Sequence, residues 1–390
     1  MIPLRARSVI FNEAAVAAGP RIIRLSTNTE RPSPLRSNEA FFARFRDPWP
    51  DGFSWYVALA GDSAIEMPPE IPGAALPAEF AYLGDGDVIS LEPSAGIVRV
   101  LFRKSSSYNH FLLTERCNNS CLMCSQPPRA VQDGWIVDEI LEALALIDRS
   151  AAEIGFTGGE PTLLGDRFIE LVRATESYLP NTALHILSNG RSFAKDGFAA
   201  LLAAVRHHDL MIGIPLYSDL PHEHDYVVQA DGAFDETIRG ILNLKQHHVR
   251  VELRVVLQRP TTKRLPDLAR FIARNLLFVD HVALMALEIT GFAKANLDRL
   301  WIDPMEYGRE LQSAVGVLSR AGIRTSIYNS QLCVLPKDLH HFARRSISDW
   351  KQQYLPVCDQ CSARERCAGF FETSGTKISQ GIAPIIAEAA

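Results

Sequence analysis

Between about residue 108 and residue 321, short runs rich in β-branched and aromatic residues alternate with amphipathic helical patterns. Such alternation predicts parallel strands joined by right-handed helical crossovers. Six units are fewer than the eight that close a barrel, so we expect an α/β fold with an open, partial (βα)6 barrel. The expected strands are 111–114, 153–157, 184–187, 210–217, 251–257 and 281–287, and the helices 137–148, 167–178, 198–205, 234–246, 265–275 and 303–321.

The segments on either side of this alternation differ from it in composition. The first hundred residues have strand composition at 54–59, 87–91 and 96–102, and their prolines disfavour long helices. The last seventy or so residues are polar and rich in cysteine. We therefore expect three domains, which are a β-rich N-terminal domain (1–105), a partial barrel (106–322) and a small cysteine-rich C-terminal domain (323–390).

Bulk properties narrow the classes of function. The net charge of −5 and pI of about 6.1 give no electrostatic reason to expect nucleic acid as a partner. No apolar run approaches the roughly 18 residues that span a bilayer, so no membrane segment is expected. The N-terminus has neither a long apolar core nor a small-residue cleavage site, which predicts a cytoplasmic location. In such a reducing compartment, clustered thiols bind metal more often than they form disulfides.

The first cysteine group consists of Cys117, Cys121 and Cys124, on the loop after the first expected strand. Iron–sulfur clusters take thiolate ligands, and this short spacing lets one loop bind several irons. Three ligands for a [4Fe–4S] cluster leave one iron open to a further ligand. The alternatives are a zinc site, which usually closes with four ligands, or buried thiols without metal.

The C-x3-C-x2-C loop resembles the signature of the radical S-adenosylmethionine (SAM) superfamily. Met123 departs from it, because the superfamily often has an aromatic residue there. The second strand ends in Gly158-Gly159-Glu160, similar to the family's GGE motif, and the resemblance implies contact with the SAM amino group. Glycines permit close backbone approach, and a carboxylate can accept hydrogen bonds from an ammonium.

Three further residues are assigned to SAM by the same resemblance. Ser188 and Asn189 end the third strand, where the family contacts the ribose, and Ser218 ends the fourth. Asn-Gly is also a common turn, so Asn189 followed by Gly190 is open to a purely structural interpretation. No catalytic acid or base is identified from the sequence.

The second cysteine group consists of Cys333, Cys358, Cys361 and Cys367. Four thiolates can fully ligate a second, auxiliary [4Fe–4S] cluster or a structural zinc ion. The position of this group after the barrel resembles the twitch or SPASM extensions of peptide maturases, which favours the cluster. The surrounding excess of basic residues indicates either a solvated face or a docking patch for an acidic partner; these residues are Arg344, Arg345, Lys351, Arg364 and Arg366.

Residues 284–296 and 346–350, which accompany the cysteine groups, resemble the His-Xaa-Ser system radical SAM maturase family, of the HxsC type. The resemblance implies reductive cleavage of SAM to a 5′-deoxyadenosyl radical and modification of a ribosomally made peptide with His-Xaa-Ser repeats. It also implies a second radical SAM maturase as partner. The basic residues near the second cysteine group suggest, as the acidic partner, an electron donor such as a flavodoxin or ferredoxin. The alternatives are a non-catalytic iron–sulfur or zinc scaffold for another maturase, and a radical SAM enzyme that acts on a small molecule.

Overall fold

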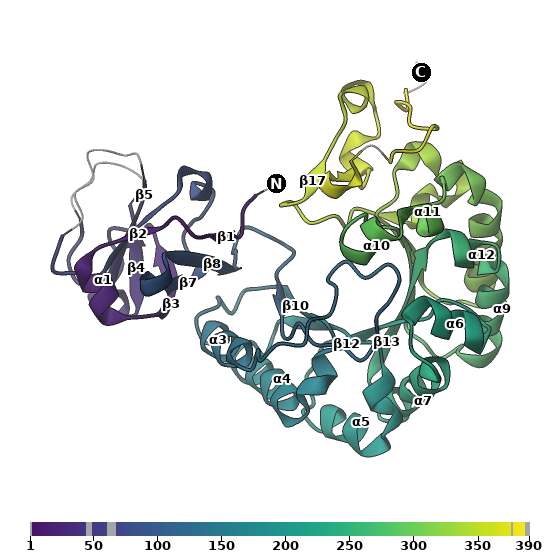
Figure 1. Ribbon diagram of the computed structural model, residues 1–390, viewed down its shortest axis with the longest axis horizontal. Coiled ribbons are helices and arrows are strands. Elements are labelled where there is room, and N and C mark those ends of the chain that lie inside the picture. The colour runs from purple at the N-terminus through teal and green to yellow at the C-terminus, as the bar shows by residue number, and fades with distance from the viewer. Residues whose placement is uncertain (1, 44–48, 61–67, 376, 387–390) are drawn as a thin grey trace.

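The computed structural model describes residues 2–43, 49–60, 68–375 and 377–386. Two large sheets form the protein, and Figure 1 shows the smaller N-terminal unit beside a wide ring of strands and helices. In the part of the chain so described, no helix has the length and apolar character needed to cross a bilayer. A cytoplasmic location stays a prediction.

The ring contains one sheet of eight parallel strands that follow one another in chain order. Its middle strand pairs are in continuous register; Ile212, for example, pairs with Val251 on the next strand. No ladder between described residues joins the first strand to the last, so the sheet is an open barrel. The strands are β9 (His110–Leu112), β10 (Glu153–Thr157), β11 (Ala183–Leu187), β12 (Leu210–Pro215), β13 (Arg250–Leu257), β14 (His281–Ala286), β15 (Thr325–Tyr328) and β16 (Ala343–Arg344).

The expected count of six strands is wrong, although all six expected strands are present. The sheet continues through β15 and β16, beyond residue 322, where the sequence predicts a separate small domain. β15 has only four residues and β16 only two. Segments this short carry too few alternating residues for the pattern to be recognised, and their pairing depends on the neighbouring strand.

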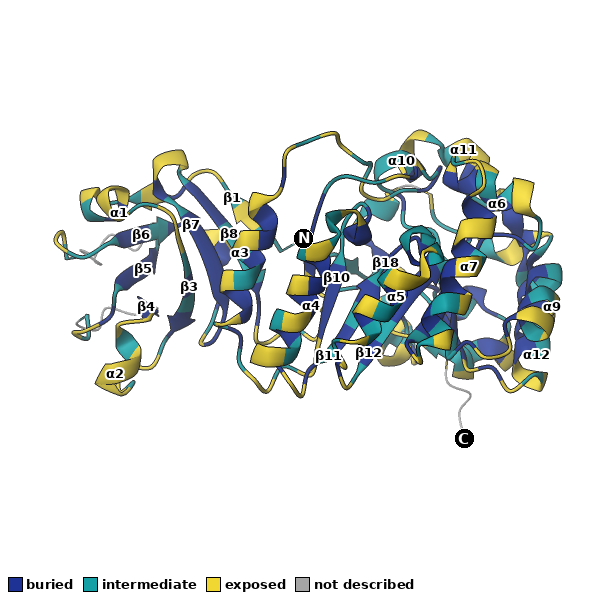
Figure 2. Cartoon of the chain, turned by 90° about the horizontal axis from the view of Figure 1, so that it is seen from below, coloured by how far each residue is buried: buried dark blue, intermediate teal, exposed yellow. Residues whose placement is uncertain are grey.

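Amphipathic helices cover the outer face of this sheet. Figure 2 shows their exposed faces turned outward and their buried faces turned toward the strands. The principal helices are α3 (Trp135–Leu144), α4 (Asp166–Tyr178), α5 (Asp196–Ala203), α6 (Pro221–Val228), α7 (Ala233–Gln246), α9 (Leu265–Asn275) and α12 (Gly308–Arg320), and the shorter ones are α8 (Arg259–Thr262), α10 (Gly291–Ala295) and α11 (Leu297–Leu300).

The last expected helix begins later than the sequence indicates. Asp303 and Glu306 form a reciprocal capping box that closes a single 3-10 turn, and α12 begins only at Gly308. The start signal at Asp303 and Pro304 is therefore genuine, but it starts a turn that precedes the helix.

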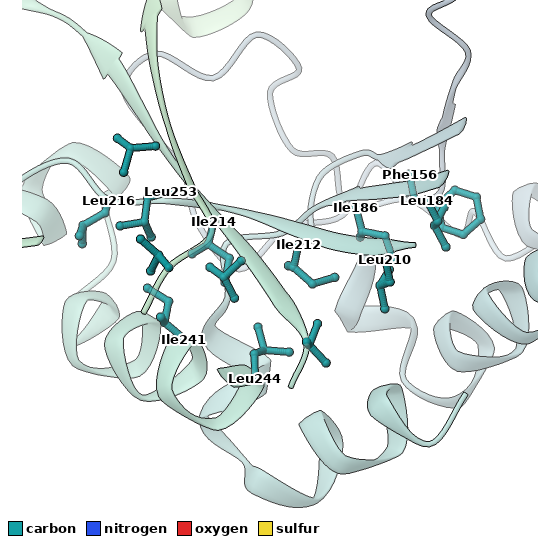
Figure 3. Close-up of a cluster of buried hydrophobic side chains, with 14 of the residues drawn as sticks. Phe156, Leu184, Ile186, Leu210, Ile212, Ile214, Leu216, Ile241, Leu244 and Leu253 are labelled. Atoms are coloured by element: carbon teal, nitrogen blue, oxygen red, sulfur yellow. The ribbon is translucent and has the colours of Figure 1, made fainter. Parts of the chain in front are cut away.

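The core lies between sheet and helices. Ile186, Ile212 and Leu253 on neighbouring strands pack with Ile241 and Leu244 of α7, all fully buried (Figure 3). Each such side chain contributes roughly 1.5–3 kcal/mol by leaving water. This packing fixes the strand ends, and with them the loops above the sheet.

The N-terminal unit is an eight-stranded mixed sheet with its own core. Two strands that are consecutive in the chain, β1 and β2, lie at opposite edges, so the sheet curls round on itself. The expected strands near 54–59, 87–91 and 96–102 are present. The bounds are β1 (Arg5–Ala6), β2 (Ile10–Phe11), α1 (Glu13–Ala18), β3 (Arg21–Ser26), α2 (Ser33–Arg36), β4 (Glu39–Phe42), β5 (Trp55–Leu59), β6 (Gly73–Leu76), β7 (Val88–Glu92) and β8 (Ile97–Phe102).

This unit contacts the barrel through several residues, and two ion pairs mark the places of contact. Arg99 of β8 forms an ion pair with Glu139 of α3 at 2.5 Å. Arg103 pairs with Asp349, on the segment after β16, at 2.5 Å. The N-terminal unit therefore touches both the first helix of the barrel and the C-terminal segment.

Candidate functional site

The loop of Cys117, Cys121 and Cys124 follows β9, and its entry is held by Asp133. This buried carboxylate accepts hydrogen bonds from Thr114 Oγ1 at 2.7 Å and from the Glu115 N–H at 2.7 Å. Arg116 Nε donates to it at 3.1 Å. Burial alone would raise the pKa of Asp133, but these hydrogen bonds and the charge of Arg116 outweigh it and lower that pKa. The loop therefore starts from a fixed, ionised anchor that sequence reasoning missed.

The end of β10 lies directly against this loop entry. The Gly159 N–H donates to Thr114 O at 2.8 Å, and the Glu160 N–H donates to Arg116 O at 2.8 Å. A Cβ on Gly158, whose φ is +147°, would lie 2.5 Å from Thr114 O, and one on Gly159 would overlap Arg116 O. Both glycines are therefore required by the chain's own packing, independently of any ligand.

Glu160 is fully buried and joins the ends of β10 and β11. Its Oε1 accepts from Thr162 and from Ser188 Oγ at 2.8 Å, and its Oε2 accepts from the Asn189 N–H at 2.6 Å. Burial raises the pKa of Glu160, and these hydrogen bonds oppose the rise. Oε2 accepts one bond, so it can take one further donor. Gly158, Gly159, Glu160, Ser188 and Asn189 thus form one connected group next to the cysteine loop.

Ser218 stands apart from that group. It is fully buried after β12, and its Oγ donates to Glu223 of α6 at 2.7 Å and accepts from the Leu220 N–H at 3.2 Å. These bonds shape the start of α6. The assignment of Ser218 to SAM stays a prediction, as do those of the other five residues.

The three thiols of the loop are close enough to interact electrostatically. Burial raises the pKa of Cys117 to about 11 and that of Cys121 to about 12, and in both cases neighbouring thiols of the loop add to the rise. Cys124 is also partly buried, with a raised pKa. A bound iron would reverse this effect, since a coordinating thiol is deprotonated outright. The donor set, three thiols without a fourth protein ligand among them, fits a cluster with one open iron.

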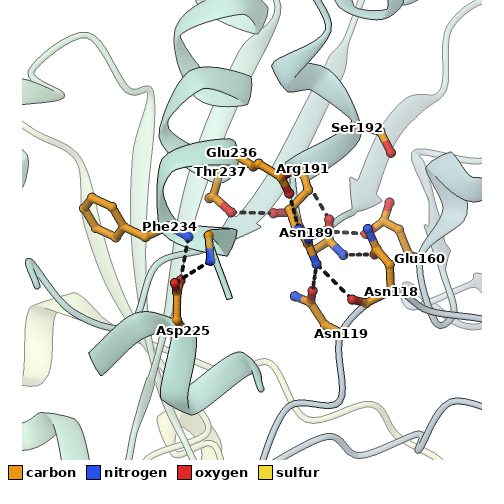
Figure 4. Close-up of polar contacts among 12 residues, drawn as sticks. Asn118, Asn119, Glu160, Asn189, Arg191, Ser192, Asp225, Phe234, Glu236 and Thr237 are labelled. Atoms are coloured by element: carbon orange, nitrogen blue, oxygen red, sulfur yellow. Dashed lines mark hydrogen bonds and ion pairs between the residues drawn. The ribbon is translucent and has the colours of Figure 1, made fainter. Parts of the chain in front are cut away.

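A second set of missed residues links the middle of the loop to the barrel (Figure 4). Asn189 Nδ2 donates to Asn118 Oδ1 at 2.6 Å, and Arg191 Nη1 donates to Asn119 Oδ1 at 2.6 Å. Thr237 of α7 donates to Asn189 O at 3.1 Å. No spacing rule identifies Arg191 in the sequence; only its position after a strand end, at the edge where loops meet, points to it.

The inner face of the barrel carries a buried polar group. Glu252 accepts from Arg254 Nη1 at 2.6 Å and from His281 Nδ1 at 2.6 Å, and His185 Nε2 lies 3.5 Å away. Burial alone would raise the pKa of Glu252, but these partners lower it. The hydrogen bond to Glu252 fixes Arg254 in the interior. Burial raises the pKa of the Tyr217 phenol, and the charge of nearby Arg254 opposes that rise. Arg254 can therefore bind an acceptor on a substrate.

The second cysteine group is also brought together. Cys333, Cys358, Cys361 and Cys367 line one cavity, with an empty volume of about 340 Å³ including the part open to solvent. Tyr354, Phe370 and the tail residues 383–385 complete its largely apolar wall. Burial and the neighbouring thiols of Cys367 and Cys358 raise the pKa of Cys333. Within the described residues, no three His, Cys, Asp or Glu side chains are arranged to hold a single metal ion.

The geometry defines a parallel α/β protein with a three-thiol site at the carboxyl ends of its strands. Residues 111–272, which span β9 to α9 and include that site, match the family model "Radical SAM superfamily". The chain therefore contains a radical SAM superfamily domain, which places it in the radical SAM class of enzymes. No curated protein sequence matches the chain significantly.

Several solved structures are similar. Streptococcus suis SuiB bound to S-adenosylmethionine has 14% identity and a TM-score of 0.47, covering 59% of this chain and 52% of that one. Native anSMEcpe with bound AdoMet has 16% identity and a TM-score of 0.45, covering 56% and 63%. Methylornithine synthase (PylB) has 15% identity and a TM-score of 0.42, covering 58% and 65%. The chain thus spans about half the length of SuiB, and nothing about its substrate follows from likenesses this slight.

Proposed function

We propose that this protein is a radical SAM peptide maturase, which cleaves SAM reductively at a [4Fe–4S] cluster held by Cys117, Cys121 and Cys124. The observation that carries the proposal is the gathering of these three thiols beside Glu160, at the edge of a parallel sheet where ligands of such folds bind. When bound, the cluster and SAM supply a 5′-deoxyadenosyl radical that removes a hydrogen atom from the substrate.

The chain's own residues have defined tasks in this proposal. Asp133 fixes the start of the cysteine loop through three hydrogen bonds. Glu160 Oε2 has acceptor capacity for the SAM ammonium, and Ser188 and Asn189 hold Glu160 in place. Arg254, fixed by Glu252, offers a cation inside the barrel for an acidic or carbonyl group. Met123 and Tyr217 pack in one apolar cluster beside the loop, which helps to exclude water.

The substrate is proposed as a ribosomally made peptide, with His-Xaa-Ser repeats as the resemblance of residues 284–296 and 346–350 implies. The second cavity supports this proposal, since four thiols there suit an auxiliary [4Fe–4S] cluster of a twitch-like extension. A second radical SAM maturase and an acidic electron donor are the partners implied. The separate N-terminal unit, which touches both α3 and the C-terminal segment, is a further surface that a peptide can use.

The proposal is tested by anaerobic reconstitution, reduction with dithionite, and measurement of 5′-deoxyadenosine from SAM. The parent protein should form it, and the variant with Cys117, Cys121 and Cys124 all changed to Ala should form none. A scaffold without catalytic activity would form none in either case. The active protein is then incubated with a peptide that has His-Xaa-Ser repeats or with a small-molecule extract, and the products are compared by mass spectrometry. A peptide unchanged in mass argues for a small-molecule substrate.

A further inference from the structure

Arg191 connects the cysteine loop to two other elements. It is the first residue of η4 (Arg191–Ala194), directly after Gly190. Its Nη1 donates to Asn118 O at 2.9 Å and to Asn119 Oδ1 at 2.6 Å, and its Nε donates to Glu236 of α7 at 2.5 Å. Its side chain is only 14% exposed. The guanidinium therefore has a single, well-defined orientation, which Figure 4 shows beside the loop.

This contact determines which way the Asn119 amide points. A guanidinium has donors and no acceptor, so Asn119 must turn its oxygen toward Arg191 and its NH2 group away. The Asn119 backbone N–H in turn donates to Cys117 Sγ at 3.4 Å. One buried residue therefore accepts a hydrogen bond from Arg191 on its side chain and donates one from its backbone to a thiol of the loop.

The loop backbone does not depend on Arg191 alone. The Ser120 N–H donates to Val228 O at 3.1 Å, and the Leu122 N–H donates to Val227 O at 2.9 Å. Loss of Arg191 should therefore loosen the backbone at Asn118 and Asn119, which it contacts directly, while Ser120 and Leu122 keep their contacts with α6. The effect expected of Arg191 is orientation, which can be separated from folding.

We propose that Arg191 is a positioning residue that acts through Asn119: it holds the Asn119 backbone N–H toward the Cys117 sulfur and so raises the reduction potential of the cluster bound by that loop. Hydrogen bonds to cluster sulfurs stabilise the reduced, more negative state, and outer partners that orient such donors tune the metal. The inference rests on the proposed function only in that a cluster binds at Cys117, Cys121 and Cys124.

The test is a redox titration of that cluster, followed by electron paramagnetic resonance in reconstituted protein without SAM. Arg191→Gln and Asn119→Ala should each lower the reduction equilibrium constant about tenfold, or about 59 mV for one electron. The double variant should shift no further than either single variant, because both remove the same hydrogen bond. Arg191→Lys, which keeps one charged donor, should restore most of the potential.

The matched control is Arg167→Gln, an arginine of α4 that pairs with Glu170 and has no contact with the loop. It should leave the potential unchanged. An unchanged potential in Arg191→Gln, or additive shifts in the double variant, would overturn the proposal.

Metal-free protein gives a second readout that does not need the proposed function. There Arg191→Gln should speed amide hydrogen exchange at residues 117–119 and leave the exchange of Ser120 and Leu122 unchanged. Unchanged exchange in that segment overturns the positioning role. Faster exchange in a protein that binds no cluster supports the positioning role and contradicts the proposed function.

Discussion

The two cysteine sites are built on different principles. The loop of Cys117, Cys121 and Cys124 lies above the sheet. Side-chain hydrogen bonds from Asp133, before α3, and Asn189, after β11, hold it, and the backbone after β10 bonds to its entry. The cavity of Cys333, Cys358, Cys361 and Cys367 lies among short 3-10 turns, and its remaining lining is mostly apolar. Three thiols with polar neighbours suit a site that must also bind a polar ligand, whereas four thiols in an apolar wall suit a closed one.

The largest expected effect separates the two sites by metal content. Changing Cys117, Cys121 and Cys124 to Ala should lower the iron content from about eight to about four per chain. Changing Cys358 and Cys361 to Ala should also lose about four irons but leave SAM binding intact, because only the first site leaves an iron open. Iron and zinc analysis of both variants is the measurement. Zinc lost from the second variant in place of iron would show a structural zinc site there.

The polar design of the first site is tested by Glu160→Gln. The amide nitrogen of the glutamine would be a donor where the Glu160 carboxylate accepts from Thr162, Ser188 and Asn189, so hydrogen bonds would be lost. One charge-assisted hydrogen bond is worth about 1.5–3 kcal/mol. SAM affinity should fall at least tenfold, and the free energy of unfolding should also fall. Isothermal titration and urea unfolding measure the two. An unchanged affinity together with lower stability would show that Glu160 serves packing alone.

Buried histidine also distinguishes the regions. His224, 1% exposed, stacks on Tyr217 near the first site, and His207, 9% exposed, lies shortly before β12. None of the described residues that line the second cavity is a histidine. Burial lowers the pKa of His207 and of His224 to about 4, from 6.5. Between these values the unfolded chain binds protons that the folded chain does not.

The free energy of unfolding should therefore fall as the pH drops from about 6.5 to 4, by up to about 1.4 kcal/mol per pH unit for each of these histidines. Urea unfolding at several pH values measures the slope. His224→Asn, which keeps an acceptor for the Tyr217 N–H, should flatten it. The control is His222→Asn, an exposed residue of the same helix. An unchanged slope in His224→Asn would contradict the assignment of this pH dependence to His224.

The smallest expected effect concerns electron delivery near the second site. Arg344 and Arg345 are exposed. Among the described residues they bond only to neutral groups: carbonyl oxygens, including Glu365 O at 3.1 Å, and the Gln352 side-chain amide. Lys351 and Arg364, in contrast, are paired with Glu288 and Asp359. Changing Arg344 and Arg345 to Glu should slow turnover with a flavodoxin, more at low salt than at high salt. Turnover with dithionite, which needs no docking surface, is the control, and an equal loss with both donors would point to folding or substrate binding.

The sequence determined much of the barrel and the identity of the reactive groups. The alternation of short strand-like runs with amphipathic helical patterns predicted β10 and α9 with their observed bounds. The spacing of Cys117, Cys121 and Cys124 predicted a thiol site after the first strand, since residues this close in sequence remain close in space when they lie on one loop. Short strands such as β15 and β16 have no such signal.

Only the tertiary structure decided how those groups are held. Asp133 is distant in sequence from Thr114, and Arg191 is more distant still from Asn119, yet each pair is in hydrogen-bond contact. The sequence marked Gly158 and Gly159 as ligand contacts, whereas the structure shows that both are needed where β10 passes the loop. Likewise, Cys333 meets Cys358 across a long separation. The physical reason is that such contacts depend on where the ends of parallel strands meet, and packing of the whole sheet and its helices determines that edge.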